Sequence, residues 1–283
     1  MSGQFSNSLI KLGCVDYINA LPLYYGGILS FPSVDLWFGK PSELLSRFLT
    51  FSPSNRNITP SEVFLTGSTG TFLPSAAFLP TYGIAAYKNI LSVNLYAKPS
   101  LFSYSSTLSK IAITKESCAS VALLQVLCNR LWKINPKFIS TSTEILLQNY
   151  SQYDGILLIG DTALKNQIIQ GLVTYDLANA WYELTRLPFV FACFLLSPNF
   201  SQKKLLESFL DTSLKFFEQD PALVLARAKQ KTLLPIDYLK RYYSHCQYRL
   251  GKEELRGLDT FRKYYEELSS SNHLTKPSAL QSR

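Results

Sequence analysis

The sequence predicts an α/β protein of two lobes with a helical C-terminal segment, and three observations support this. Strand-like and helix-like segments alternate as far as residue 196. The 283 residues are more than one hydrophobic core usually organises. The two longest apolar, β-prone stretches, 84–96 and 188–196, bracket the block between them, as expected of segments that carry the chain to a second lobe and back.

We therefore expect residues 1–95 and 196–268 to form lobe 1 and residues 96–195 to form lobe 2. The polar tail at 269–283 is expected to be disordered, because it has few apolar side chains to bury. Ligands of two-lobed proteins bind in the cleft between the lobes, so the candidate site residues are sought there.

Strands are predicted where short runs of apolar and β-branched residues end at turn residues. Such runs lie at 9–15, 34–38, 62–66, 84–96, 110–114, 137–140, 155–160, 173–177 and 188–196.

Helices are predicted where apolar residues recur at helical spacing. They lie at 20–30, 41–49, 117–132, 141–149 and 162–170, and then at 201–218, 221–230, 236–245 and 252–268, so that the chain after residue 200 is entirely helical. Three N-terminal signals are expected: Ser42 as the cap of the second helix, a capping box of Thr141 and Glu144, and Asp161 as the cap of a helix that Gly171 ends.

The formal net charge of +8 does not indicate a nucleic-acid partner. The excess of basic residues is spread over amphipathic helices and mixed with Glu, which is typical of a solvated surface. The sequence has no basic run with interleaved aromatic residues of the kind that a nucleic-acid groove needs. A mildly positive protein favours an anionic small molecule as its ligand.

The five cysteines are odd in number, form no CxxC pair and lie mostly among apolar residues. We interpret them as buried, reduced thiols in a reducing compartment, the cytoplasm. The two histidines form no cluster with ligand spacing, so no metal is expected. The N-terminal segment has no signal-peptide pattern, and no run of about 18 apolar residues predicts a membrane span.

Small polar residues follow several predicted strands, at the carboxyl ends where open α/β sheets bind ligands. Asn19, in the junction Tyr17-Ile18-Asn19, is interpreted either as a helix cap or turn residue or as an amide that contacts a ligand. Ser92 lies in an apolar strand, where a buried hydroxyl needs a partner, and that partner is either protein or ligand.

The other two junctions precede predicted helices. At the start of one helix, Ser117 or Glu116 is expected as the cap, and the alternative is that the hydroxyls of Ser117 and Ser120 join the free backbone N–H groups in binding a carboxylate. Asp161 follows Gly160 and is interpreted as an N-cap, with contact to a ligand hydroxyl or holding the lobes closed as the alternatives.

Four stretches together resemble a known family: YINALPL (17–23), ILSVNLY (90–96), LLIGDTAL (157–164) and DLANAWYELTRLPFVFACF (176–194). In this order and spacing they are similar to the chorismate dehydratases of the futalosine route to menaquinone. The resemblance covers roughly residues 8–265. It implies a periplasmic-binding-protein type 2 fold, with a mixed sheet flanked by helices in each lobe. It also implies a cytoplasmic lyase that removes water from chorismate, a small dicarboxylate, to give 3-[(1-carboxyvinyl)oxy]benzoate.

The resemblance assigns roles to the residues quoted above. Asn19 and Ser92 match catalytic positions, and Tyr17, Ser117, Ser120 and Asp161 match substrate-binding ones. The reaction needs neither a metal nor a cofactor, because it needs only positioning and charge stabilisation. The base is expected to be the substrate's own side-chain carboxylate or Asp161. The chain is expected to be a monomer or a homodimer.

Three positions depart from the family's pattern: Ala119 where Thr is frequent, and Lys88 and Arg186 at or near usual glycines. Lys88 and Arg186 are interpreted either as charges for a dianionic ligand or as exposed side chains.

Two other functions are compatible with the sequence. The sister dihydroxynaphthoate synthase has the same fold, but its Ser-Pro-Cys-Pro-Asn type of first motif is absent here. A non-catalytic protein of this fold that binds a small anion is the other alternative.

Overall fold

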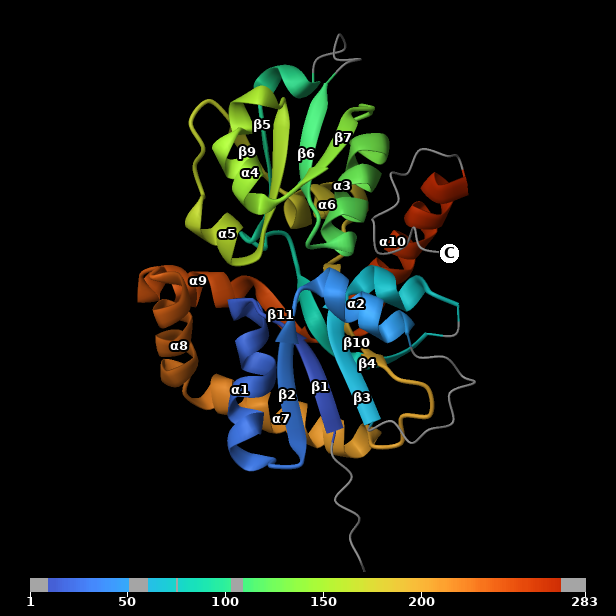
Figure 1. Cartoon of the computed structure of the whole chain (residues 1–283), viewed down its shortest axis with the longest axis vertical. Coiled ribbons are helices and arrows are strands. Elements are labelled where there is room, and N and C mark those ends of the chain that lie inside the picture. Colours follow the sequence, from blue (N-terminus) through green and yellow to red (C-terminus); the bar gives the residue numbers. More distant parts are fainter. Residues whose placement is uncertain (1–9, 51–60, 75, 103–108, 271–283) are drawn as a thin grey trace, which may run out of the picture.

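The computed structural model describes residues 10–50, 61–74, 76–102 and 109–270. Its strands form two sheets that lie one above the other in Figure 1, with helices packed around each of them. Within these described residues, no helix is long and apolar enough to cross a membrane.

The first sheet has the strand order β11-β4-β10-β3-β1-β2. Its strands are β1 (Ile10–Val15), β2 (Val34–Gly39), β3 (Ser61–Gly67), β4 (Ala77–Ala86), β10 (Phe189–Leu196) and β11 (Cys246–Arg249). β1 is parallel to β2 and β3, whereas β10 runs antiparallel to β3 and β4, so the sheet is mixed.

The second sheet has the order β7-β6-β8-β5-β9 and is also mixed. Its strands are β5 (Val93–Ala97), β6 (Lys110–Thr114), β7 (Lys137–Thr141), β8 (Gly155–Ile159) and β9 (Val173–Asp176). A mixed sheet flanked by helices in each half confirms the predicted fold class.

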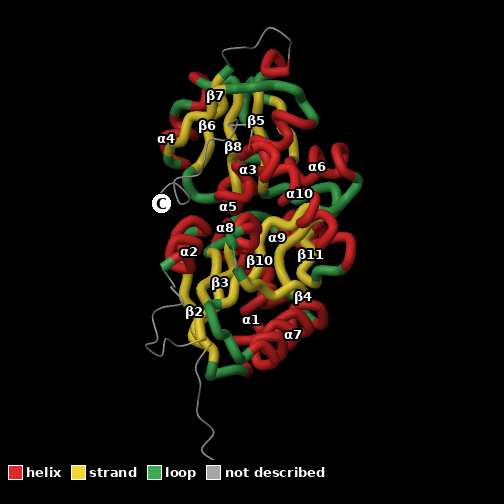
Figure 2. Tube along the Cα trace, turned by 90° about the vertical axis from the view of Figure 1, so that its right-hand side faces the viewer, coloured by secondary structure: helices red, strands yellow, loops and turns green. Residues whose placement is uncertain are grey.

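Most helices overlap their predicted ranges. The helices are α1 (Leu21–Ser30), α2 (Pro41–Leu49), α3 (Cys118–Arg130), α4 (Thr143–Gln148), α5 (Gly160–Lys165), α6 (Leu177–Thr185), α7 (Lys203–Gln219), α8 (Ala222–Thr232), α9 (Ile236–His245) and α10 (Lys252–Ser270). However, α6 was not predicted, and the helix expected at 162–170 is the shorter α5. The short 3-10 helices are η1 (Ile18–Ala20), η2 (Ser68–Phe72), η3 (Pro99–Phe102) and η4 (Tyr150–Gln152). Figure 2 shows α1 and α7 together beside the first sheet, and α3 beside the second.

The C-terminal helices return to both sheets. Phe261 of α10 lies 5.9 Å from Trp181 of α6 and 4.8 Å from Phe189 of β10, measured between ring centroids. Such aromatic pairs bury large apolar areas. α10 therefore packs on both halves of the protein and joins them.

The single strand predicted over 84–96 is wrong. β4 ends at Ala86 in the first sheet, and β5 begins at Val93 in the second. Lys88 and Leu91 have positive φ angles of 73° and 62°, which strands do not allow. The break between β4 and β5 is stabilised by a residue far away in the sequence. The Asp176 carboxylate accepts hydrogen bonds from the N–H groups of Ile90 and Leu91 at 2.9 and 2.7 Å.

Residues 189–195 were expected in lobe 2, but as β10 they lie between β3 and β4 of the first sheet. The antiparallel pairing on both sides fixes this placement. The chain therefore returns to the first sheet between α6 and β10, before residue 189. The rest of the division into lobes stays a prediction.

Several helix ends differ from prediction. α2 begins after Lys40, whose N–H donates to Glu43, so Ser42 lies inside the helix rather than capping it. Ser142, not Thr141, caps α4.

The C-terminal half also differs from prediction. α5 begins at Gly160 and ends at Lys165, so Asp161 is not its cap and Gly171 does not end it. β11 interrupts the C-terminal segment, which was expected to be all helix. Of the predicted tail, residues 269 and 270 are helical, and 271–283 lie outside the described residues.

We predict that Asp176→Ala lowers the free energy of unfolding by about 2 to 4 kcal/mol, because the change removes a helix cap and leaves buried N–H groups unpaired. One carboxylate oxygen caps α6 through Ala178 and Asn179, while the other binds the break after β4. Burial raises the pKa of Asp176, against the effect of these N–H groups.

The matched control for this experiment is Asp220→Ala, which removes an exposed carboxylate that accepts only the N–H of Ala222 at the start of α8. Its cost is expected to be about 1 kcal/mol. Urea unfolding measures both variants. Equal losses of unfolding free energy in the two variants would contradict a role of Asp176 in holding the break between β4 and β5.

Candidate active site

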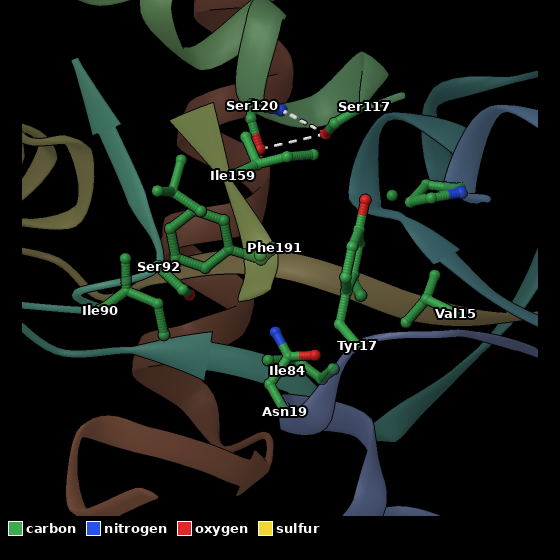
Figure 3. Close-up of a pocket in the computed structure, with 15 residues that line it drawn as sticks. Val15, Tyr17, Asn19, Ile84, Ile90, Ser92, Ser117, Ser120, Ile159 and Phe191 are labelled. Atoms are coloured by element: carbon green, nitrogen blue, oxygen red, sulfur yellow. Dashed lines mark hydrogen bonds between the residues drawn. The ribbon is translucent and has the colours of Figure 1, made fainter. Parts of the chain in front are cut away.

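A cavity lies between the two sheets. Its walls are mostly apolar, and its polar side chains come from the ends of strands and the start of α3 (Figure 3). The apolar lining includes Val15, Ile84, Ile90, Val93, Ile159 and Phe191, and the polar side chains are those of Tyr17, Asn19, Ser92, Ser117 and Ser120. Five of the six predicted site residues are thus brought to one cavity, and Asp161 is not among its lining residues.

Asn19 lies in η1, directly after β1, and its side chain points into the cavity (Figure 3). Its Oδ1 is buried and has no hydrogen-bond partner among the described residues. A buried acceptor without a donor costs about 1 to 3 kcal/mol, so such groups usually await a ligand or a water. Asn19 is not a helix cap, since it lies within η1 and no side chain caps η1 or α1.

Ser92 immediately precedes β5 and is fully buried. Its Oγ accepts a hydrogen bond of 3.1 Å from the hydroxyl of Tyr242 in α9. Its carbonyl accepts the N–H of Gly160 at 2.7 Å, which ties the start of β5 to the start of α5. Ser92, which the sequence singled out by its polarity, therefore has a protein partner and also lines the cavity.

Ser117 caps α3, as its position predicted. Its Oγ accepts the N–H of Ser120 at 3.1 Å, and its hydroxyl donates to Ser120 Oγ at 3.0 Å (Figure 3). Both side chains also line the cavity, so capping and ligand contact are compatible. Ala119 is buried and does not line the cavity; a Cβ at Gly67 would lie 3.2 Å from that of Ala119.

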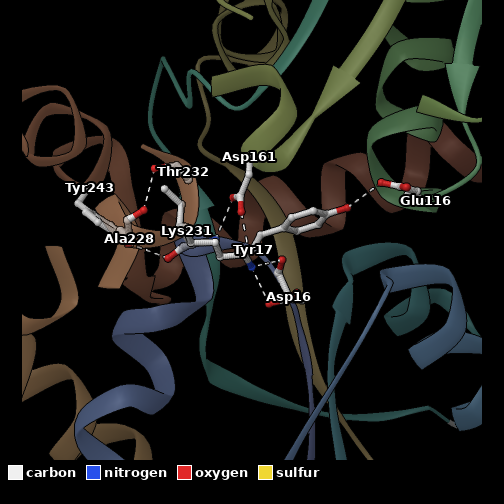
Figure 4. Close-up of polar contacts among 9 residues, drawn as sticks. Asp16, Tyr17, Glu116, Asp161, Ala228, Lys231, Thr232 and Tyr243 are labelled. Atoms are coloured by element: carbon white, nitrogen blue, oxygen red, sulfur yellow. Dashed lines mark hydrogen bonds and ion pairs between the residues drawn. The ribbon is translucent and has the colours of Figure 1, made fainter. Parts of the chain in front are cut away.

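Asp161 joins the second sheet to the turn that carries Asn19. Its carboxylate accepts the N–H of Ile18 at 3.0 Å and lies 3.6 Å from Lys231 Nζ (Figure 4). Lys231, in α8, also binds Asp16. Burial raises the pKa of Asp161, whereas the Ile18 N–H and Lys231 lower it. Of the alternatives for Asp161, this geometry supports holding the lobes closed rather than N-capping.

A second link joins the two halves of the protein. Tyr17 O–H donates to Glu116 at 3.3 Å, and Lys40 pairs with the same carboxylate at 3.1 Å. Burial and the nearby Glu116 carboxylate raise the pKa of Tyr17 well above its usual range. Tyr17 therefore remains a neutral phenol between the two halves.

The described lining of the cavity has no carboxylate, imidazole, ammonium or guanidinium group. Lys88 and Arg186 do not line it; their cationic groups lie 5.4 and 5.3 Å from the ring centre of Tyr182. Both have positive φ, at or near positions where the resembling family has glycine. They are therefore not charges for a ligand in this cavity.

Metal binding has no support in the structure. Nowhere in the described ranges do three or more His, Cys, Asp or Glu side chains gather in a way that could hold a metal ion. All five cysteines are free, as expected, and all but Cys246 are buried.

Sequence reasoning placed no site residue after residue 200 and so missed the C-terminal contribution. Tyr242 reaches Ser92, Tyr243 O–H donates to the Ile18 carbonyl at 2.8 Å, and Lys231 reaches Asp161. The only signal was a pair of tyrosines on the apolar side of a predicted helix, which is equally typical of a core.

The sequence is similar to those of known proteins over most of its length. A family model described as menaquinone biosynthesis matches residues 10–267. The chorismate dehydratase of Thermus thermophilus is 28% identical over 88% of this chain and 93% of its own length. The chorismate dehydratase of Campylobacter jejuni is 30% identical over 52% of this chain and 64% of its own.

A solved structure shows the same fold. The periplasmic aliphatic sulphonate binding protein of Escherichia coli superposes with a TM-score of 0.59 at 15% identity, over 95% of this chain and 94% of that one. The predicted periplasmic-binding-protein fold is thus confirmed.

We predict that Gly160→Ala destabilises the protein more than Gly171→Ala. Both glycines have positive φ, 57° and 79°, so each substitution costs about 1 to 2 kcal/mol in backbone strain. A Cβ at Gly160 would lie 2.6 Å from the Tyr17 ring, whereas one at Gly171 meets nothing within 4 Å. Urea unfolding compares the two. Equal losses would show that Tyr17 does not pack tightly on the second half.

Proposed function

Because the chain belongs to the menaquinone biosynthesis family, we propose that it is a chorismate dehydratase of the futalosine route. The observation that carries this proposal is the similarity to the Thermus enzyme over nearly the whole of both chains. The reaction removes water from chorismate and gives 3-[(1-carboxyvinyl)oxy]benzoate. The five free thiols support the expectation of a reducing compartment, the cytoplasm.

The chemistry suits a site made of neutral groups. The C3 hydrogen of chorismate is acidic because it is vinylogous to the ring carboxylate. Its loss as a proton, with departure of the C4 hydroxyl, forms one molecule of water and an aromatic ring. The gain in aromaticity drives the reaction, so the protein needs only to hold the substrate and stabilise the developing charge.

The cavity offers neutral groups for each task. The start of α3, with the hydroxyls of Ser117 and Ser120, supplies donors for a carboxylate at the positive end of a helix dipole. Across the cavity lie Asn19 and Ser92, and we assign them to the C4 hydroxyl (Figure 3). The unpaired Oδ1 of Asn19 accepts a hydrogen bond from this hydroxyl, and Ser92 donates one to its departing oxygen.

We assign the base to the substrate. The Asp161 carboxylate is occupied by Ile18 N–H and Lys231 and does not line the cavity. The described lining residues offer no other group that takes up a proton near neutral pH. The side-chain carboxylate of chorismate is the remaining candidate, and an enclosed cavity would fold it toward C3.

We predict that the purified protein converts chorismate without added cofactor, and that Asn19→Ala and Ser92→Ala each lower kcat at least about 100-fold. Ultraviolet absorbance and a mass loss of one water follow the reaction. Asn149→Ala and Ser244→Ala are matched controls, because neither side chain lines the cavity and both bond only to residues near them in the sequence: Asn149 to Ile145 and Gln152, and Ser244 to Arg241.

Each result of that assay has a distinct meaning. Binding of chorismate with no conversion by the wild type would favour the anion-binding alternative. Wild-type turnover in Asn19→Ala would remove Asn19 from the mechanism.

We also predict a pH profile without a bell shape. kcat should stay constant between about pH 6 and pH 9, because the described lining has no group that titrates there and the raised pKa of Tyr17 keeps it protonated. At lower pH, kcat falls as the substrate carboxylates gain protons. Asp161, whose pKa is raised, also loses its charge as the pH falls and with it the pair with Lys231.

Asp161→Asn separates the two causes of the acid limb, because an amide cannot titrate but keeps an oxygen for the Ile18 N–H. The acid limb is expected to persist in this variant. Its disappearance would assign the limb to Asp161, and a maximum near pH 7 in the wild type would indicate a protein base.

A further inference from the structure

The hydrogen bond between Tyr242 and Ser92 joins the C-terminal helices to the candidate active site. Tyr242 is 1% exposed and Ser92 is 0% exposed, so neither hydroxyl exchanges its partner with bulk water. The two oxygens lie 3.1 Å apart. Tyr242 does not line the cavity, and none of the steps described above uses it.

The direction of this hydrogen bond decides what Ser92 can do. A hydroxyl has one hydrogen to donate and two lone pairs to accept with. Tyr242 donates its hydrogen to Ser92 Oγ, so the hydrogen of Ser92 is not used in this contact. No other partner for Ser92 Oγ is found in the described part of the chain, and its side chain faces the cavity (Figure 3). The free hydrogen is therefore available to a bound ligand.

Tyr242 remains the donor of this hydrogen bond over the whole pH range in which the protein works. Burial raises the pKa of Tyr242 well above that of an exposed tyrosine, and the hydrogen bond to Ser92 lowers it only in part. The phenol thus keeps its proton wherever the protein is folded and active.

The position of Tyr242 is fixed by its neighbours. The next residue, Tyr243, donates to the Ile18 carbonyl at 2.8 Å, and the two rings lie 5.5 Å apart. After α9 the chain enters β11, which pairs with β4 of the first sheet. The C-terminal end of α9 therefore holds two polar residues of the site. Tyr242 bonds to Ser92 directly, and Tyr243 holds the turn that carries Asn19.

We propose that Tyr242 is a positioning residue that fixes Ser92 as a hydrogen-bond donor toward the departing hydroxyl of the substrate. This assignment rests on the proposed function. Accepting a hydrogen bond also polarises the Ser92 hydroxyl and strengthens its own donation. No proton leaves Tyr242 during the reaction, since its task is to orient Ser92.

The test is a double-mutant cycle of Tyr242→Phe and Ser92→Ala with chorismate as substrate. Tyr242→Phe is expected to lower kcat about tenfold and to change KM by less than about twofold, because the lost contact acts mainly in the transition state. In the Ser92→Ala background, the same change is expected to have no further effect. A residue that only supported the fold would instead lower both backgrounds by the same factor.

Tyr238→Phe is the matched control on the same helix, because the Tyr238 hydroxyl is buried without a partner in the described residues. It should retain wild-type kcat. If Tyr242→Phe alone does not fold, the double variant still decides, because it removes both hydroxyls and leaves neither unpaired. Its kcat should equal that of Ser92→Ala, and a further fall would overturn the assignment.

Two failures are distinguishable. Wild-type protein that does not convert chorismate would overturn the proposed function and, with it, the role of Tyr242. Wild-type turnover combined with an unchanged kcat in Tyr242→Phe would overturn the role of Tyr242 alone.

Discussion

The peptide groups of Ile18 are the point on which the site depends. The N–H donates to Asp161 of the second half at 3.0 Å, and the carbonyl accepts from Tyr243 of the C-terminal helices at 2.8 Å. Three segments far apart in the sequence therefore meet at one residue (Figure 4). Because Asn19 follows directly, its position depends on both contacts, and the one to Asp161 joins the two halves of the protein.

The neutrality of the cavity is the second constraint on function. Burying a dianion among apolar side chains is costly unless donors replace its hydration. The start of α3 and its two serines supply such donors without a cation. Lysines and acids are present nearby, but they pair with one another at the rim: Lys40 with Glu116, and Lys231 with Asp161. Ion pairs thus join the two halves of the protein, while neutral hydrogen-bonding groups line the cavity.

Local patterns were enough to predict most of the fold. Apolar periodicity located β1, α1 and β10 to within a residue or so, and small polar residues after or within predicted strands identified Asn19, Ser92, Ser117 and Ser120. Several of the failures share one cause, which is a distant partner. The break after β4 depends on Asp176, the Asp161 carboxylate is taken by Ile18, and Ser92 is held by Tyr242. Local periodicity carries no signal for such contacts.

The central claim is that the protein holds and orients chorismate, while the substrate's own side-chain carboxylate takes the proton. A chorismate analogue with that carboxylate blocked as a methyl ester tests it most directly. The account predicts that the ester competes with chorismate for binding but is not dehydrated. Dehydration of the ester at a rate close to that of chorismate would contradict the account and require a base in the protein.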